Sequence, residues 1–133
     1  MLPINVTEEL REKWLPNTTW SGLARVIELL EKGSPFLIHG CFSRAIPMGC
    51  LASHIAWNHP KTWHMTVDAG IFWLGKIAGL NPSTSHVLNL WDKKGVGDLA
   101  TRQGLLKEFR KKLEQRPIIS RNTRSGYNNL LIG

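Results

Sequence analysis

The chain has 133 residues, of which 42% are hydrophobic and 20% charged, a balance that indicates one globular domain and excludes a disordered chain. The formal net charge of +7 comes entirely from residues 93–133, which hold ten Lys and Arg against three Asp and Glu, whereas residues 1–92 hold seven of each. The first residues lack the basic and apolar segments of a secretory signal, and the longest nearly uncharged stretch, residues 33–60, carries three His and three Pro. We therefore expect no membrane span and a cytoplasmic location, in which both cysteines would be reduced thiols.

Capping and helix-breaking residues predict two helices in the first quarter of the chain. Thr7 suits the N-cap position of a short helix that Pro16 would end. A second helix is expected from about Thr19 to Gly33, because glycine commonly follows the last turn of a helix. Its core-facing residues would be Leu23, Val26, Ile27 and Leu30. Residues 36–38 form an apolar run too short to assign by periodicity, and we expect irregular structure there.

Three further helices are expected in the middle of the chain. Pro47 suits the first turn of a helix that would reach about Trp57. Thr66 would cap the next helix, which Gly79 would close. Its inward residues would be Ile71, Leu74, Ile77 and Ala78. Asn81-Pro82 again places a capping residue before a proline, which predicts a helix that ends at Lys93-Lys94-Gly95.

The last helix has the clearest pattern, with Asp98 as its cap and Pro117 as its end. Its apolar stripe consists of Leu99, Leu105, Leu106, Phe109 and Leu113, and its opposite face of Gln103, Lys107, Arg110, Lys111 and Glu114. No segment shows the alternation of a strand. The predicted fold class is therefore all-α, a single compact domain of five to six helices over residues 1–117 with a basic C-terminal helix, followed by a loose tail over residues 118–133.

Residues 39–54 hold both cysteines and two of the five histidines, which makes a metal site one hypothesis. His39 and Cys41 flank one position, and Cys50 and His54 share a face if residues 47–57 are helical. These four side chains are the donor set of a tetrahedral zinc site, although their spacing matches no standard zinc finger. The alternative is that all four are ordinary core or surface residues, since cysteine is among the most buried residue types.

A second hypothesis for the same residues is a thiol-dependent enzyme. Cys50 would lie in the first turn of its helix, where the helix dipole lowers a thiol pKa, and His54 one turn later would act as the base. A third group that would orient His54 is missing from the pattern, because Asn58 would lie at the helix end.

The basic last third predicts a surface that binds a polyanion. Cations on the outward face of the last helix, with others before and after it, suit contacts to phosphate groups. The candidate contact residues are Lys93, Lys94, Lys107, Arg110, Lys111, Arg121 and Arg124. An acidic protein partner would suit the same charges. The alternative is a solvated helix face in which Glu108 pairs with Lys112 at i,i+4.

The order of several short motifs resembles a family of small uncharacterised helical proteins of bacteria and phages. That family typically shows Cys-Leu-x-Gly-Ala and Trp-Asn-Asp, whereas here Ser53 and His54 follow Ala52, and Asp92-Lys93 follows Trp91. The resemblance covers about residues 19–115 and implies a compact helical fold in a bacterial or phage setting, with no mechanism attached. The motifs that carry it are Ile27-Glu28-Leu29-Leu30, Cys50-Leu51-Ala52, Leu88-x2-Trp91-Asp92 and the helix from Leu105 to Leu113.

We therefore expect a small, basic, non-enzymatic interaction protein that binds nucleic acid or another acidic partner through its C-terminal helix and tail, without a cofactor. The alternative from another class is the zinc site or thiol enzyme of residues 39–54. A structural or assembly role in a phage particle is a third hypothesis. The oligomeric state does not follow from the sequence.

Overall fold

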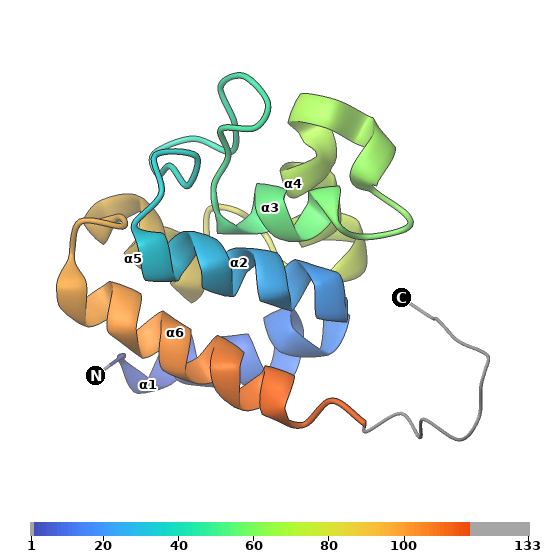
Figure 1. The fold of residues 1–133 in the computed structure, drawn as a ribbon. Helices are drawn as coiled ribbons and strands as arrows, with labels where there is room; N and C mark the ends of the chain where they lie inside the picture. The colour runs from blue at the N-terminus through green and yellow to red at the C-terminus, as the bar shows by residue number, and fades with distance from the viewer. Residues whose placement is uncertain (1, 118–133) are drawn as a thin grey trace.

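The two longest helices, α2 (Trp20–Lys32) and α6 (Leu99–Glu114), lie side by side across one face of the molecule (Figure 1). The computed structural model describes residues 2–117. Helix α3 (Leu51–Trp57) packs behind α2 and also against α4 (Ala69–Phe72). The two remaining helices, α1 (Ile4–Glu9) and α5 (His86–Lys94), pack against each other.

Short π and 3-10 turns extend or join these helices. They are the π turns η1 (Leu10–Trp14) and η4 (Trp73–Ile77) and the 3-10 segments η2 (Leu15–Asn17) and η3 (Trp63–Asp68). Within residues 2–117 there are six α-helices, and β-pairing is limited to isolated bridges, so the predicted all-α single compact domain is confirmed. None of these helices has the length and apolar character needed to cross a membrane. The tail predicted over residues 118–133 lies outside the described residues.

Three of the predicted helix boundaries are confirmed by their capping contacts. Thr19 caps α2, its hydroxyl accepting a hydrogen bond from the Gly22 amide at 3.0 Å, and Gly33 ends the helix in the left-handed region at φ 58°. Asp98 caps α6, its carboxylate accepting from the Thr101 amide at 3.0 Å. These are local signals, because each cap bonds to an amide three residues away.

The first predicted cap is wrong. The helix begins at Ile4, directly after Pro3, whose carbonyl accepts from the amides of Val6 and Thr7. Thr7 is therefore inside α1, and its hydroxyl donates to the Pro3 carbonyl at 3.2 Å. Pro16 does not end the helical stretch at once either, since it lies within the 3-10 turn η2, which follows η1 directly and continues to Asn17.

The helix predicted from Pro47 begins only at Leu51. The preceding loop, residues 36–49, folds back on itself, so that the Gly49 amide donates to the Phe36 carbonyl at 3.0 Å and the Ile38 amide donates to the Gly49 carbonyl at 2.9 Å. These bonds use backbone groups that a helix from residue 47 would need. The predicted irregular structure at residues 36–38 is confirmed.

The predicted caps at Thr66 and Asn81 are also wrong. Thr66 has φ 54° and ψ −122° within η3, and α4 begins only after Asp68. Asn81 instead forms a turn, its side-chain oxygen accepting from the Ser83 amide at 2.9 Å, and α5 begins after Ser85. Of the residues predicted to face inward from the helix after Thr66, Leu74 and Ala78 join the core, whereas Ile71 is 46% exposed.

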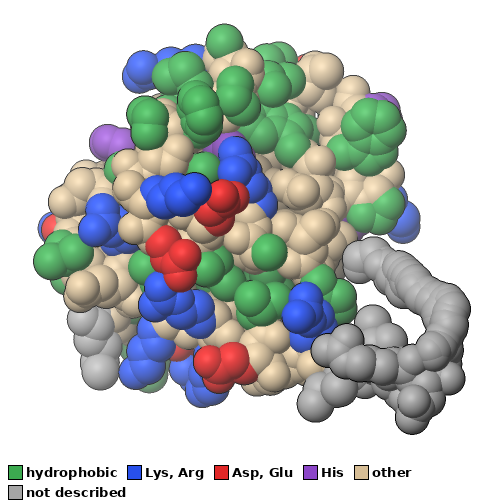
Figure 2. Space-filling view, viewed as in Figure 1, with side chains coloured by type: hydrophobic (Ala, Val, Ile, Leu, Met, Phe, Trp, Pro, Cys, Tyr) green, Lys and Arg blue, Asp and Glu red, His purple; other side chains and the backbone are tan. Residues whose placement is uncertain are grey.

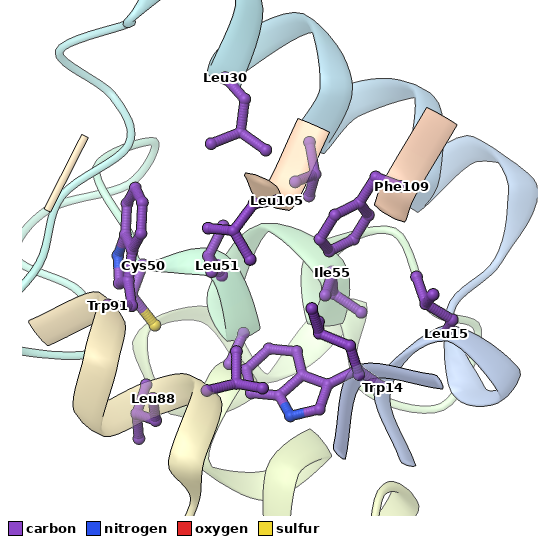
Figure 3. Packing of buried hydrophobic residues seen from close by; sticks show 14 of the residues in the cluster. Trp14, Leu15, Leu30, Cys50, Leu51, Ile55, Leu88, Trp91, Leu105 and Phe109 are labelled. Carbon is purple, nitrogen blue, oxygen red and sulfur yellow. The ribbon is translucent and has the colours of Figure 1, made fainter. Parts of the chain in front are cut away.

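The core surrounds α3, as Figure 3 shows. Leu51 and Ile55 of α3 are completely buried, and side chains from α2, α5, α6 and η1 point toward them. The completely buried aromatic rings are Trp14, Trp73, Trp91 and Phe109. Trp14 and Trp73 meet edge to face with ring centroids 5.3 Å apart, a favourable geometry for aromatic pairs. One short helix therefore organises the packing of the longer ones.

Glu9 is a buried carboxylate that joins the first helix to α5. It accepts hydrogen bonds from the Trp14 indole at 2.9 Å, the Ser85 hydroxyl at 2.6 Å, and the amides of His86 and Val87 at 2.8 and 3.1 Å. The last two are free amides in the first turn of α5, where a negative charge is favourable. Both carboxylate oxygens therefore have hydrogen-bond partners. Glu9 and Ser85 together cap the start of α5, although Glu9 is distant in the sequence.

Replacing Glu9 by Gln should lower the free energy of unfolding by about 2 kcal/mol, because the amide removes the charge and turns one acceptor into a donor facing other donors. Urea denaturation would measure the loss. Glu8→Gln is the matched control, since Glu8 is exposed on the same helix and should change stability by no more than about 0.5 kcal/mol. Equal losses in the two variants would contradict the capping role of Glu9.

Helices α3 and α4 approach so closely that Gly70 has no room for a side chain. A Cβ at this position would lie 2.4 Å from the Ser53 hydroxyl oxygen and 2.9 Å from the Ser53 backbone. Ser53 cannot turn away freely, because its hydroxyl donates to the Phe42 carbonyl at 2.7 Å. The contact depends on the absence of a side chain at residue 70.

Gly70→Ala should therefore destabilise the protein by about 1–3 kcal/mol, the cost of overpacking. Gly75→Ala is the control, because Gly75 lies in η4, the turn that continues α4. A Cβ at Gly75 meets no atom closer than 4.0 Å, so this variant should be as stable as the parent or more stable. Thermal unfolding of the two variants would decide, and a neutral Gly70→Ala would show that the helices are not in close contact.

Candidate functional site

The four candidate zinc ligands do not form a cluster. Within residues 2–117 no group of three or more His, Cys, Asp and Glu side chains is placed to hold a metal ion. Cys41 is exposed and Cys50 completely buried. The His39 ring packs against α5, with Nδ1 2.9 Å from the Asp92 carbonyl oxygen. The described residues therefore do not bring His39, Cys41, Cys50 and His54 together as a zinc site, and the loop of residues 36–49 places His39 on α5 instead.

The thiolate hypothesis also disagrees with the structure. Cys50 precedes the first residue of α3 and makes no cap hydrogen bond, and burial raises the pKa of its thiol to about 11. The His54 imidazole is buried, and its Nε2 lies 2.8 Å from the Phe36 carbonyl. Burial is the largest cause that lowers the pKa of His54, which keeps the ring neutral near pH 7. Cys50 is therefore a buried, protonated thiol, and the His54 imidazole contacts a backbone carbonyl.

The candidate cations of α6 lie on its exposed face, as predicted. Lys107, Arg110 and Lys111 are all exposed, and Arg110 forms an ion pair with Glu31 of α2. Figure 2 shows Lys and Arg side chains gathered with a few Asp and Glu over α2 and α6, whereas hydrophobic side chains gather above them, over the 36–49 loop and α4. The cations therefore form part of a mixed surface in which some are neutralised by pairing.

Arg11 joins this surface from η1. Its guanidinium donates two hydrogen bonds to the Glu108 carboxylate, at 2.9 and 3.0 Å. These bonds are the largest cause that lowers the pKa of Glu108, and Lys111 and Lys107 lower it further by their charge. Sequence reasoning paired Glu108 with Lys112, which is wrong, because a partner 97 residues away in the chain is invisible to helical spacing.

We call Arg11, Lys107, Lys111 and Lys112 the basic face. Arg11, Lys111 and Lys112 line a shallow depression of about 270 Å³ together with Glu108, and Arg11 and Lys107 line the neighbouring groove between α1 and α6. No pattern in the sequence around Arg11 identifies it as a site residue, because it lies far from the basic last third of the chain. The basic face is thus assembled from two helices at opposite ends of the chain.

The other sequence candidates lie elsewhere. Lys93 and Lys94 are exposed in the last turn of α5. The hydrogen bonds from Thr101, and to a smaller extent the charge of Lys94, lower the pKa of Asp98, the cap at the start of α6. The start of α6 precedes Lys107 by about 12 Å of helix rise. Arg121 and Arg124 lie outside the described residues.

A cleft of about 740 Å³ lies beside the basic face, and sequence reasoning missed it. Its walls include Trp20, Trp57, Trp63 and His59, with Lys112 as a charged residue at the edge shared with the basic face. We call it the tryptophan cleft. Of the tryptophans that line it, Trp63 is 60% exposed, and Trp20 and Trp57 are only partly buried.

Comparisons with known proteins add no family to this geometry. No protein-family model matches the chain, and neither a curated protein nor a solved structure matches it. The resemblance to small helical proteins of bacteria and phages therefore stays a prediction, and function must be argued from the surface itself.

The two thiols should differ in reactivity. At pH 8 a chromogenic disulfide reagent should modify one thiol of the native protein rapidly, that of exposed Cys41, and reach buried Cys50 only on unfolding. Cys41→Ser should abolish the fast reaction, and Cys50→Ser should leave it unchanged. Rapid native-state modification of Cys50 would restore the thiolate hypothesis.

Proposed function

We propose that this protein binds nucleic acid through the basic face, with contacts to the phosphate backbone. Lys107 and Lys111 stand one helical turn apart on the exposed side of α6, and Lys112 and Arg11 stand beside them. Phosphates repeat along a strand, so a row of cations on one helix suits a polyanion better than a single anion.

The observation that carries the proposal is the way ion pairs divide the charge of α6. The ion pairs within residues 2–117 use Arg11, Arg25, Lys32 and Arg110. Lys107, Lys111 and Lys112 are outside these pairs and keep their charge for solvent or for a ligand. Helix α6 carries five cations against the carboxylates of Glu108 and Glu114, so its surface keeps an excess of positive charge although both carboxylates lie near the lysines.

The bidentate contact between Arg11 and Glu108 supports the same surface. Glu108 is buried, so its charge is directed at Arg11 and little of it faces solvent. Arg11 in turn is held in one orientation while 53% of its side chain remains exposed. A preorganised guanidinium beside two lysines is a favourable arrangement for a phosphate.

Lys107→Gln with Lys111→Gln should weaken binding to a single-stranded oligonucleotide and flatten its salt dependence. Each lost phosphate contact reduces the slope of log Kobs against log salt by about 0.7 for a single strand, so the double variant should lose about 1.4. Fluorescence anisotropy with labelled DNA and RNA across a salt series would measure the slope.

Lys93→Gln with Lys94→Gln is the matched control, because it removes the same charge from the last turn of α5, outside the basic face. Its slope should stay closer to that of the parent. If the slope of log Kobs against log salt is the same in the parent and both variants, or falls equally in both variants, the basic face is not the binding site. No binding to either nucleic acid at low salt would overturn the proposed function and leave an acidic protein as the partner to test.

A further inference from the structure

The tryptophan cleft presents Trp63, an exposed aromatic ring, beside Trp20 and Trp57, which pack partly buried against the core. Trp14, Trp73 and Trp91 are completely buried, whereas Trp63 is 60% exposed. The exposed indole of Trp63 offers an open face at the cleft on which a flat ring can stack. The volume of about 740 Å³ falls within the range of about 300–1,000 Å³ typical of ligand sites.

The walls of the cleft are held by tertiary contacts. The Thr19 hydroxyl, which caps α2, also donates to the Asn58 carbonyl at 2.8 Å and so joins the start of α2 to the end of α3. The Trp57 indole donates to the Thr66 carbonyl at 2.7 Å, and its ring meets the His54 ring edge to face at 5.0 Å between centroids. Trp57 is therefore a fixed wall.

The charge of the cleft is positive. Lys112 lines it, and none of the described residues that line it is acidic. His59 accepts from the Lys61 amide through Nδ1 at 3.1 Å, and partial burial, then the charge of Lys61, lowers its pKa, so the ring is a neutral plane near pH 7. A ligand that fits these walls combines a flat apolar ring with a negative charge.

Lys112 and Leu15 line both the tryptophan cleft and the depression of the basic face. The two hollows are thus neighbours that share an edge, and a chain of phosphates lying along Arg11 and Lys111 reaches Lys112 at the mouth of the cleft. Nucleic-acid sites that accept single strands combine these same two parts, a basic track and aromatic rings on which bases stack.

We infer that the tryptophan cleft receives a base of a single-stranded nucleic acid whose phosphates lie on the basic face. This inference rests on the proposed function and deepens it, since it assigns the substrate class as single-stranded. In a duplex the bases are stacked and paired and cannot enter the cleft. The contact residues would be Trp63 and Trp20, with Lys112 at the adjoining phosphate.

The test compares three ligands of equal length: oligo(dT), an abasic strand with the same phosphates, and a duplex. Binding is followed by quenching of tryptophan fluorescence at low salt. The full chain should bind oligo(dT) more tightly than the abasic strand or the duplex, and only oligo(dT) should quench strongly.

Trp63→Ala should weaken oligo(dT) binding roughly tenfold or more and leave the salt slope unchanged, because stacking is not electrostatic. Its exposure makes the substitution compatible with folding. Trp63→Phe keeps a ring and should recover most of the affinity. The matched control is Phe72→Ala, which removes an aromatic side chain that is 43% exposed and does not line the cleft, and it should have no effect.

The outcomes separate this inference from the proposed function. If all three ligands bind equally and Trp63→Ala changes nothing, the cleft assignment is overturned while phosphate binding by the basic face stands. If none binds at low salt, both fail. Quenching by a proline-rich peptide but not by oligo(dT) would assign the cleft to a polypeptide and would also overturn the inference.

Discussion

The Glu9 carboxylate is the interaction on which the arrangement of the helices depends. It is buried, it accepts from four donors, and those donors come from η1 and from the start of α5, more than seventy residues away. A buried charge is tolerated only when it is fully hydrogen-bonded, so the carboxylate allows one placement of the first helix against α5. The π turn of η1 serves this contact by bringing Trp14 back over Glu9, five residues earlier.

The same first helix connects the two ends of the fold. Two residues after Glu9, Arg11 forms its bidentate contact with Glu108 of α6. Helix α5, held at its start by Glu9, holds the 36–49 loop at its end, where the Trp91 indole donates to the Ile38 carbonyl at 2.7 Å and the Asp92 carboxylate accepts from the Gly40 amide at 3.0 Å. The contact between Arg11 and Glu108 therefore ties the proposed binding surface to the first helical segment, and α6 itself contributes only part of the cations.

Local capping signals predicted the helix boundaries at Thr19 and Asp98 but failed at Thr7 and Asn81, whose side chains make other local hydrogen bonds. Thr19 and Asp98 each bond to an amide three residues on, so spacing alone identified them. Pro47 looked like a helix start, but the backbone bonds of Gly49 to Phe36 and Ile38 commit that segment to a loop. In the second half of the chain, the Asn81 side chain accepts from the Ser83 amide and so stabilises a turn. Ser85 and Glu9 cap α5 instead.

The sequence by itself determined the all-α class, the concentration of positive charge in the last third, and the outward placement of Lys107, Arg110 and Lys111, because helical periodicity and charge are properties of neighbouring residues. The tertiary structure decided that Arg11 neutralises Glu108, that the Cys and His side chains of residues 39–54 are apart, and that Trp63 lines a cleft while Trp14 is buried. Each of these features depends on which segments distant in the sequence are in contact. Those tertiary contacts, and not the neighbouring residues in the chain, set a side chain's burial, pKa and hydrogen-bond partners.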